Sequence, residues 1–230
     1  MLTQWLTHFS LHRTATSGEP DRPKPEIGVS ACLLGRPVRY NGETKSAPVL
    51  TELLLQHIQM QEFCPEVGIG LPVPRPPIQA VSYDDGIRIV GVEQPENDFT
   101  AALTHYAHTV PRTLHGFVLK ARSPSCAVRS APLLNTRGEQ IDLVSGQFSH
   151  TLQQRFPCMP ICDESTLSDS QAVHAFLLCV YFYQHWHTAQ SLVQVYLWRD
   201  ALMRLGAEHM DTGTRTSLMH YIECLAAHSQ

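Results

Sequence analysis

The order of apolar and polar residues changes several times along the chain, between short apolar runs and segments with helical periodicity. Short apolar runs, typical of buried strands, occupy residues 27–30, 115–119 and 159–162, and residues 61–63 suit a further strand. Apolar residues recur at helical spacing in residues 47–58, 98–110 and 146–156, which predicts three helices. Strands that alternate with helices form parallel sheets. The pattern therefore predicts an α/β fold with a Rossmann-like, mostly parallel sheet flanked by helices.

One pair of strands departs from this alternation. Residues 78–83 and 87–92 are typical of strands, and Asp84, Asp85 and Gly86 stand between them. An Asp-Gly pair supplies the positive φ that a tight turn needs. We expect a β-hairpin beside the sheet.

Both ends of the chain have helical patterns outside the sheet. Residues 168–204 are long, periodic and free of Pro and Gly, with a break expected near Thr188 and an end at Gly206, and residues 212–227 predict a final helix. Leu2, Trp5, Leu6 and Phe9 predict a short docking helix, although a disordered tail is an equally open interpretation. We divide the chain into an extension and linker (1–25), an α/β domain (26–168) and a helical appendage (169–230).

Composition restricts the partners. The chain has 230 residues, 43% of them hydrophobic, and a formal net charge of -4, which gives no bulk electrostatic reason to bind DNA. No apolar run approaches the length of a membrane span, and the first residues lack the pattern of a secretory signal. Seven irregularly spaced cysteines fit reduced thiols better than a disulfide framework. We therefore expect a cytoplasmic protein with a small-molecule substrate.

Three cysteines follow predicted strands: Cys32, Cys64 and Cys126. Ligands of parallel α/β sheets gather at the carboxyl ends of the strands, so these thiols are expected to converge. Soft thiolates select zinc, copper(I) or iron-sulfur clusters. From spacing alone, the three cysteines are interpreted at least as well as small buried hydrophobes, because free cysteines are commonly buried.

The residues around these cysteines form five blocks. They are Ser30-Ala-Cys32-Leu-Leu-Gly35, Arg39-Tyr40-Asn41-Gly42, Cys64-Pro-Glu66-Val, Gly70-Leu-Pro-Val-Pro-Arg75-Pro-Pro and Lys120-Ala-Arg-Ser123-Pro-Ser125-Cys126. In this order they resemble the thiouracil desulfidase (TudS-like) family. The resemblance runs from about residue 27 to residue 169.

The resemblance implies a 4Fe-4S cluster held by Cys32, Cys64 and Cys126, with one iron open for the sulfur of the substrate. It also implies that Glu66 and Ser123 are the catalytic pair. Glu66 suits a base that takes a proton from water, and Ser123 suits a proton relay. Six further residues of the blocks are expected to bind substrate: Ser30, Arg39, Asn41, Arg75, Lys120 and Ser125.

Two positions depart from the family pattern. Asn41 stands where the family usually has Asp, and Ala127 stands where it usually has Gly. The first change removes a charge, and the second restricts a backbone that would need positive φ. Both bear on turnover more than on cluster binding.

The expected reaction is desulfidation of 2-thiouracil or a related free thiolated nucleobase or nucleoside, with release of sulfide. Transfer RNA carrying 4-thiouridine is the alternative substrate, because residues 182–196 resemble, weakly, the helical domain fused to larger relatives. A non-catalytic accessory protein with zinc at the three cysteines is the alternative of another class.

Other sulfur and imidazole groups are interpreted as structural. We expect Cys158, Cys162, Cys179 and Cys224 to be buried hydrophobes. The histidine pairs 105/108 and 185/187 have helical surface spacing and are expected to be solvated.

Overall fold

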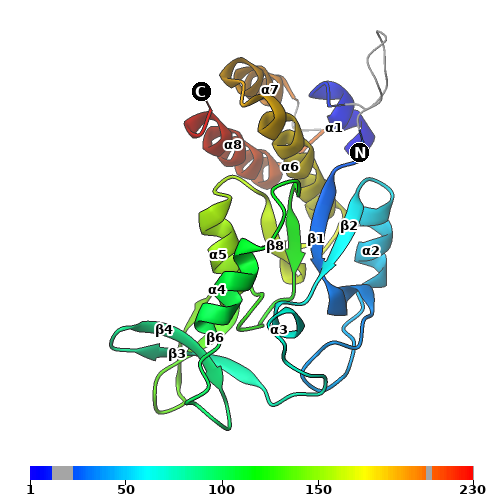
Figure 1. Cartoon of the computed structure of the whole chain (residues 1–230). Coiled ribbons are helices and arrows are strands. Elements are labelled where there is room, and N and C mark those ends of the chain that lie inside the picture. The colour runs from blue at the N-terminus through cyan, green and yellow to red at the C-terminus, as the bar shows by residue number, and fades with distance from the viewer. Residues whose placement is uncertain (12–22, 206–208, 230) are drawn as a thin grey trace.

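A computed structural model describes residues 1–11, 23–205 and 209–229 of the chain (Figure 1). Its central element is a four-stranded sheet, here sheet A, in the order β2-β1-β5-β8. The strands are β1 (Glu26–Ser30), β2 (Gln59–Phe63), β5 (Phe117–Leu119) and β8 (Ile161–Asp163), and all neighbours are parallel. The four strands predicted for this sheet are therefore confirmed, and so is the Rossmann-like α/β fold.

The centre of sheet A is tightly packed. Ile27, Val29, Phe117 and Val118 are buried, as the apolar runs predict for strands covered on both faces. A Cβ at Gly28 would lie 2.0 Å from the Phe117 ring, so this strand position requires glycine. The packing holds β1 and β5 in the register that brings their ends together.

Helices cover both faces of sheet A (Figure 1). The helices α4 (Thr100–His108) and α5 (Gln147–Arg155) lie on one side, where the Phe148 ring of α5 packs 6.1 Å from that of Phe117. The helix α2 (Pro48–Leu55) lies on the other side and contacts α6 (Ser170–Ala189). Asp98 accepts a hydrogen bond from the Thr100 N–H and so caps α4, close to the predicted start.

The predicted hairpin belongs to a second sheet that the sequence did not predict. In this sheet B the order is β4-β3-β6-β7, formed by β3 (Ile78–Tyr83), β4 (Gly86–Gly91), β6 (Ala131–Leu134) and β7 (Gln140–Val144). β3 pairs antiparallel with β4 and parallel with β6. The strand β7 is mostly exposed and pairs with β6 through an irregular register, so its residues lack a clear period.

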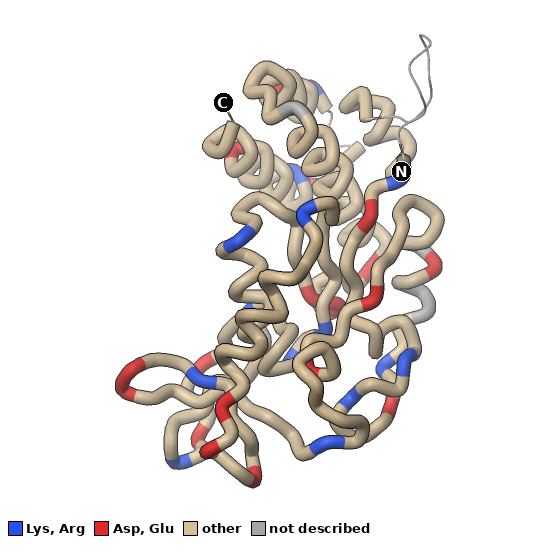
Figure 2. Tube along the Cα trace, in the orientation of Figure 1, with Lys and Arg blue, Asp and Glu red and all other residues tan. Residues whose placement is uncertain are grey.

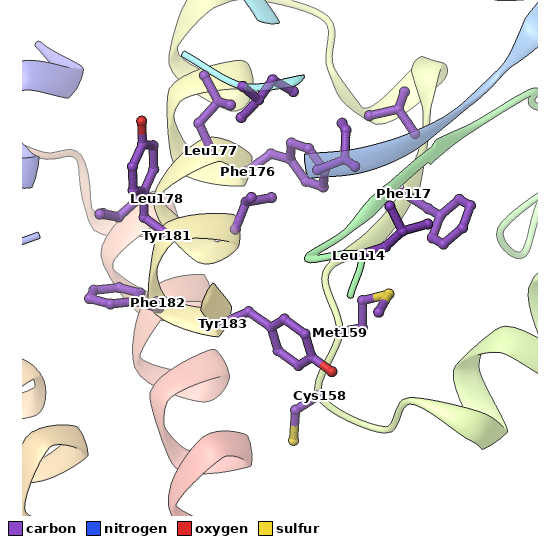
Figure 3. Packing of buried hydrophobic residues seen from close by; sticks show 14 of the residues in the cluster. Leu114, Phe117, Cys158, Met159, Phe176, Leu177, Leu178, Tyr181, Phe182 and Tyr183 are labelled. Atoms are coloured by element: carbon purple, nitrogen blue, oxygen red, sulfur yellow. The ribbon is translucent and has the colours of Figure 1, made fainter. Parts of the chain in front are cut away.

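The C-terminal helices pack on the α/β part through one continuous core. They are α6, α7 (Leu192–Arg204) and α8 (Thr212–Ala227), and the break between α6 and α7 falls at Gln190, which has φ 47°. Figure 3 shows Phe176 and Tyr183 of α6 reaching toward Leu114 and Met159. The predicted end at Gly206 lies outside the described residues.

The N-terminal helix is present as α1 (Leu2–His8) and packs on α6. Leu2, Trp5, Leu6 and Phe9 are buried, and the Phe9 ring lies 5.1 Å from that of Phe182. The linker expected after it falls largely on residues 12–22, outside the described part. The division into three segments remains a prediction, since the buried core includes residues of α1, β1 and α6 alike. In the described ranges no helix is both long and apolar enough to cross a membrane.

Candidate metal centre and active site

Three neighbouring strands of sheet A end beside a single cavity. Cys32 lies in the short helix η1 (Ala31–Leu34) directly after β1, and Cys64 follows β2 as the residue that begins the short helix α3 (Pro65–Gly68). Cys126 lies in the loop that follows β5. All three line the cavity, so the structure brings together the cysteines that the sequence selected.

The thiols act on one another and are poorly solvated. Burial, followed by the charge of Cys64, raises the pKa of Cys32 to about 11. Burial also raises the pKa of Cys126, with smaller contributions from Glu66 and the other two thiols. Burial raises the pKa of Cys64, although the Val67 N–H at its sulfur acts against it. Such thiols are held as thiolates by a bound metal, which supplies the missing positive charge.

The three cavity sulfurs are not all in contact with one another. Among the described residues, one group of three ligating atoms lies within 4.8 Å of one another, and it does not include these cysteines, so at least one pair of their sulfurs is farther apart than 4.8 Å. Two thiolates bound to one zinc at about 2.3 Å are only about 3.8 Å apart. As they stand, the three thiols are therefore not arranged around a single zinc ion.

The cavity next to the cysteines has a volume of about 470 Å³, within the range of small-molecule sites. Of the residues proposed from the sequence blocks, Ser30, Arg39, Glu66, Arg75, Lys120 and Ser123 also line it. Tyr40, Lys45, Arg122 and Ile78 are further lining residues. Ile78 begins β3, so sheet B closes one side of the cavity.

Glu66 is the only carboxylate among the lining residues, and two side chains fix its position. Arg75 donates from Nε and Nη2 to its Oε2, both at 2.8 Å, and Ser125 Oγ donates to Oε1 at 3.0 Å. The Glu66 and Arg75 side chains are 14% and 4% exposed. The carboxylate therefore has one orientation beside the thiols.

Arg75 was expected to bind substrate, but its donors are already used. Besides Glu66, it donates to the Pro72 carbonyl at 3.2 Å and to the Val38 carbonyl at 3.0 Å. Ser125 is fully buried, lies outside the lining and donates to Glu66. Both residues are placed to position Glu66.

Ser123 organises the loop of Cys126. Its Oγ accepts hydrogen bonds from the N–H groups of Ser125, at 3.2 Å, and Cys126, at 3.1 Å. Because both contacts use oxygen lone pairs, the hydroxyl hydrogen can be donated into the cavity.

Ser30 and Lys120 join the ends of β1 and β5. Ser30 Oγ accepts from the Lys120 N–H at 2.9 Å, and its hydroxyl lies against the Cys126 thiol and lowers its pKa. The Lys120 ammonium forms an ion pair with Glu164 of the short helix η2 (Glu164–Thr166). Sequence reasoning missed Glu164, which has no local motif and becomes a partner only through the pairing of β5 with β8.

The cavity is locally positive despite the acidic chain. Arg39 pairs with Glu43 at 3.3 Å, whereas Lys45 and Arg122 have no ion pair in the part of the chain that is described. Sequence reasoning missed Lys45, which sits in an aperiodic loop and is held there by its N–H donating to the Cys32 carbonyl. Arg36, which follows the first of the sequence blocks, pairs with Glu62 on the surface, outside the lining.

The two departures from the family pattern have local explanations. Asn41 is exposed, lies outside the cavity lining and accepts a hydrogen bond from the Glu43 N–H. Ala127 is buried and is not among the residues with positive φ, so the expected backbone restriction does not arise. Its carbonyl accepts from the Gly146 N–H, which anchors the Cys126 loop to α5.

The remaining cysteines divide into two kinds. Cys162 and Cys179 are partly covered by the core and have raised pKa values because of burial, as expected of structural thiols. Cys158 is buried and Cys224 is partly buried, as expected, but their sulfurs also lie 2.8 Å apart, which was not predicted. Their distance in sequence concealed this contact.

The fold and the cavity together define an α/β protein with a cysteine-lined cavity at the carboxyl edge of a parallel sheet. Residues 27–164 match the family model of 2-thiouracil desulfurase, and the chain therefore belongs to that family. A solved structure described as a [4Fe-4S]-dependent thiouracil desulfidase, TudS, is similar, with a TM-score of 0.50 and 31% sequence identity over 63% of this chain and 93% of that chain. No curated protein matches.

Proposed function

We propose that this protein is a [4Fe-4S]-dependent desulfidase that replaces the sulfur of a thiouracil-type pyrimidine with oxygen and releases sulfide. The convergence of Cys32, Cys64 and Cys126 on one cavity is the observation on which the proposal depends. Membership of the 2-thiouracil desulfurase family and the likeness to a [4Fe-4S]-dependent thiouracil desulfidase support it. Seven free cysteines suit the reducing cytoplasm in which such a protein would work.

Cys32, Cys64 and Cys126 would hold the cluster. Three thiolates leave one iron of a cubane without a protein ligand, and such an iron supplies a soft Lewis acid for a thiocarbonyl sulfur. The Glu66 and Val67 N–H groups at Cys64 and the Ser30 hydroxyl at Cys126 lower the pKa values of these thiols and so offset part of the rise that burial causes.

Glu66 and Ser123 would handle the protons of a formal hydrolysis. Water forms a bond to the ring carbon, the C–S bond breaks, and the sulfur leaves as sulfide. Glu66, held by Arg75 and Ser125, accepts a proton from the attacking water. Ser123 donates its hydroxyl hydrogen to the ring nitrogen or the departing sulfur and is reprotonated from solvent.

The unpaired cations would bind the pyrimidine and its developing negative charge. Lys45 and Arg122 line the cavity without an ion pair among described residues, so their charges are available to a ligand. Arg39 has only an exposed partner, Glu43, and could exchange it. Asn41, which lies outside the lining, is not included in this substrate set.

A free base or nucleoside fits this site better than transfer RNA. Only three basic residues follow Asp163, namely Arg199, Arg204 and Arg215, with no lysine. Figure 2 accordingly shows few blue segments on α6, α7 and α8. Phosphate contacts dominate RNA affinity, so these helices offer little for it.

Anaerobic reconstitution tests the proposal. The wild-type protein should contain four irons and four acid-labile sulfides per cluster and release sulfide from 2-thiouracil, whereas Cys126→Ala should lose both. Cys179→Ser, a substitution on α6 away from the cavity, is the matched control and should retain both.

Glu66→Gln separates chemistry from assembly. This variant should keep the cluster and lose about 10²- to 10⁴-fold in the rate of sulfide release. Wild-type protein with a full cluster that releases no sulfide from 2-thiouracil or 4-thiouridine would refute the proposal. Zinc in place of iron after anaerobic purification would instead favour the accessory role.

A further inference from the structure

A second group of metal-ligating atoms lies away from the cavity. The sulfurs of Cys158 and Cys224 are 2.8 Å apart, and Cys158 Sγ lies 3.2 Å from His228 Nδ1. All three ligating atoms lie within 4.8 Å of one another. Cys158 is buried, Cys224 is half-buried and His228 is exposed, so the group is open to solvent on one side.

This group is separate from the cysteine cavity. Cys158 precedes β8 and therefore lies at the amino end of that strand, whereas the cavity cysteines follow the carboxyl ends of their strands. In Figure 3 Cys158 lies beside Tyr183 of α6, next to the turn that leads into β8. Cys224 and His228 are also beyond the residues that match the family model, which end at 164.

The sequence spacing suits one metal ion. Cys224 and His228 are four residues apart at the end of α8, so their side chains project from the same face of the helix. Pairs of ligands separated by three residues recur in zinc sites, and two thiolates with one imidazole and a water are a known zinc ligand set. Cys158 provides the third ligand from a different part of the fold.

The distances also limit what the group can hold. Two thiolates on zinc are about 3.8 Å apart, so the sulfurs would separate by about 1 Å to bind it. A disulfide would need them to approach to about 2.05 Å. The imidazole favours zinc over a disulfide, because the nitrogen 3.2 Å from Cys158 Sγ would be a ligand of zinc and would have no role in a disulfide.

The electrostatic surroundings of the two thiols also favour a bound cation. Burial, and then the neighbouring thiol of Cys224, raises the pKa of Cys158, and no cation appears among the causes. Two thiolates here would therefore lack a positive partner unless a cation bound between them. His228 Nδ1 also lies 2.9 Å from the Cys224 carbonyl, so the imidazole would leave this contact to present Nδ1 to a metal ion.

We propose that Cys158, Cys224 and His228 form a zinc site, with water as the fourth ligand, that fastens the end of α8 to the turn before β8. Tyr221 already links these two elements, because its hydroxyl donates to the Cys158 carbonyl at 3.0 Å. The zinc would add a second, stronger link at the same contact. The proposal does not depend on desulfidase activity.

Zinc binding to the cluster-loaded protein tests the site. Holoprotein is dialysed against zinc chloride with a competing chelator, and zinc and iron per chain are measured together. Wild type should bind one zinc without losing iron, and zinc-edge X-ray absorption should give two sulfurs at about 2.3 Å and a nitrogen at about 2.0 to 2.1 Å. Heating should show a zinc-dependent rise in Tm.

Variants assign the ligands. Cys224→Ser and His228→Ala should each weaken zinc binding by at least about tenfold and abolish the rise in Tm, while Cys179→Ser should behave as wild type. His228 is exposed at the helix end, so its variant tests the site even if Cys224→Ser fails to fold.

Three results would overturn the proposal: no zinc above the chelator background in wild type, unchanged binding in His228→Ala, or a Cys158–Cys224 disulfide found by peptide mass spectrometry in freshly purified protein that then takes up no zinc. Sulfide release from 2-thiouracil is measured in parallel. Because zinc uptake and desulfidation are separate readouts, either proposal can fail without the other.

Discussion

Replacing Arg75 with methionine should leave the Glu66 carboxylate buried without its cationic partner. Arg75 supplies two of the hydrogen bonds to Glu66 Oε2, and its side chain is only 4% exposed. Methionine has a similar reach but no donor, so the carbonyls of Val38 and Pro72 also lose a partner. Ser125 alone would then hold the carboxylate.

The expected effect on stability is large. Removing one partner of a buried ion pair lowers the free energy of unfolding by about 3 to 5 kcal/mol. For a chain of this size, each kcal/mol changes Tm by about 2 to 4 °C, which gives a fall of about 6 to 20 °C. Thermal unfolding of the cluster-free protein, followed by circular dichroism, measures it. The double variant Glu66→Gln/Arg75→Met should recover part of the loss, with a coupling energy of about 0.5 to 3 kcal/mol.

Kinetics separate positioning from substrate binding. If Arg75 only orients Glu66, Arg75→Met should lower kcat for sulfide release and leave KM nearly unchanged. If KM rises while kcat stays at the wild-type value, Arg75 binds substrate and the assignment is wrong. If Tm falls by less than about 2 °C, the Glu66–Arg75 ion pair contributes little to stability.

Three further substitutions test other parts of the structure. Ser123→Ala leaves the N–H groups of Ser125 and Cys126 without their acceptor. The free energy of unfolding, measured with urea, should fall by about 1 to 2 kcal/mol, and the rate of sulfide release should fall about 10²-fold. Ser123→Thr should retain most of both. Gly146→Ala places a Cβ 2.4 Å from the Ser125 backbone. Iron per chain after reconstitution should therefore fall, and the free energy of unfolding should drop by about 1 to 3 kcal/mol. Equal iron content in variant and wild type would contradict the close contact of Gly146 with the Cys126 loop. Burial, with a smaller effect of His187, lowers the pKa of His115, whose Nδ1 accepts from the Glu26 N–H. The folded protein therefore binds fewer protons there than the unfolded chain, so its unfolding free energy should fall as pH drops below about 6.5, and fall less steeply in His115→Asn.

Apolar patterns predicted most of sheet A and its helices, although β2 is mostly exposed and has no apolar run. The runs that became β1 and β5 are buried on both faces, and burial of that kind leaves a clear signal in sequence. β6 and β7 were missed because β6 is short and contains Pro132, and β7 is exposed over most of its length. Their pairing depends on β3, which is far away in the chain.

The sequence blocks identified residues of the cavity but not how they share contacts. The blocks placed Glu66, Arg75 and Ser125 in one site, and only the structure shows that the last two donate to the first. Lys45 and Glu164 had no motif: Lys45 is placed by a hydrogen bond from its loop N–H to the Cys32 carbonyl, and Glu164 by the pairing of β5 with β8. Short-range patterns cannot encode such pairings.

The two thiol groups follow from the direction of the strands. All strands of sheet A run the same way, so residues that follow them collect at one edge and residues that precede them collect at the other. Cys32, Cys64 and Cys126 follow strands, and Cys158 precedes one. Further ligands for a metal ion at Cys158 must come from an element that covers the amino edge of the sheet. The end of α8 lies there and supplies Cys224 and His228. The helical segment beyond the family match thus adds to the α/β part a pair of ligands that its own strands could not provide.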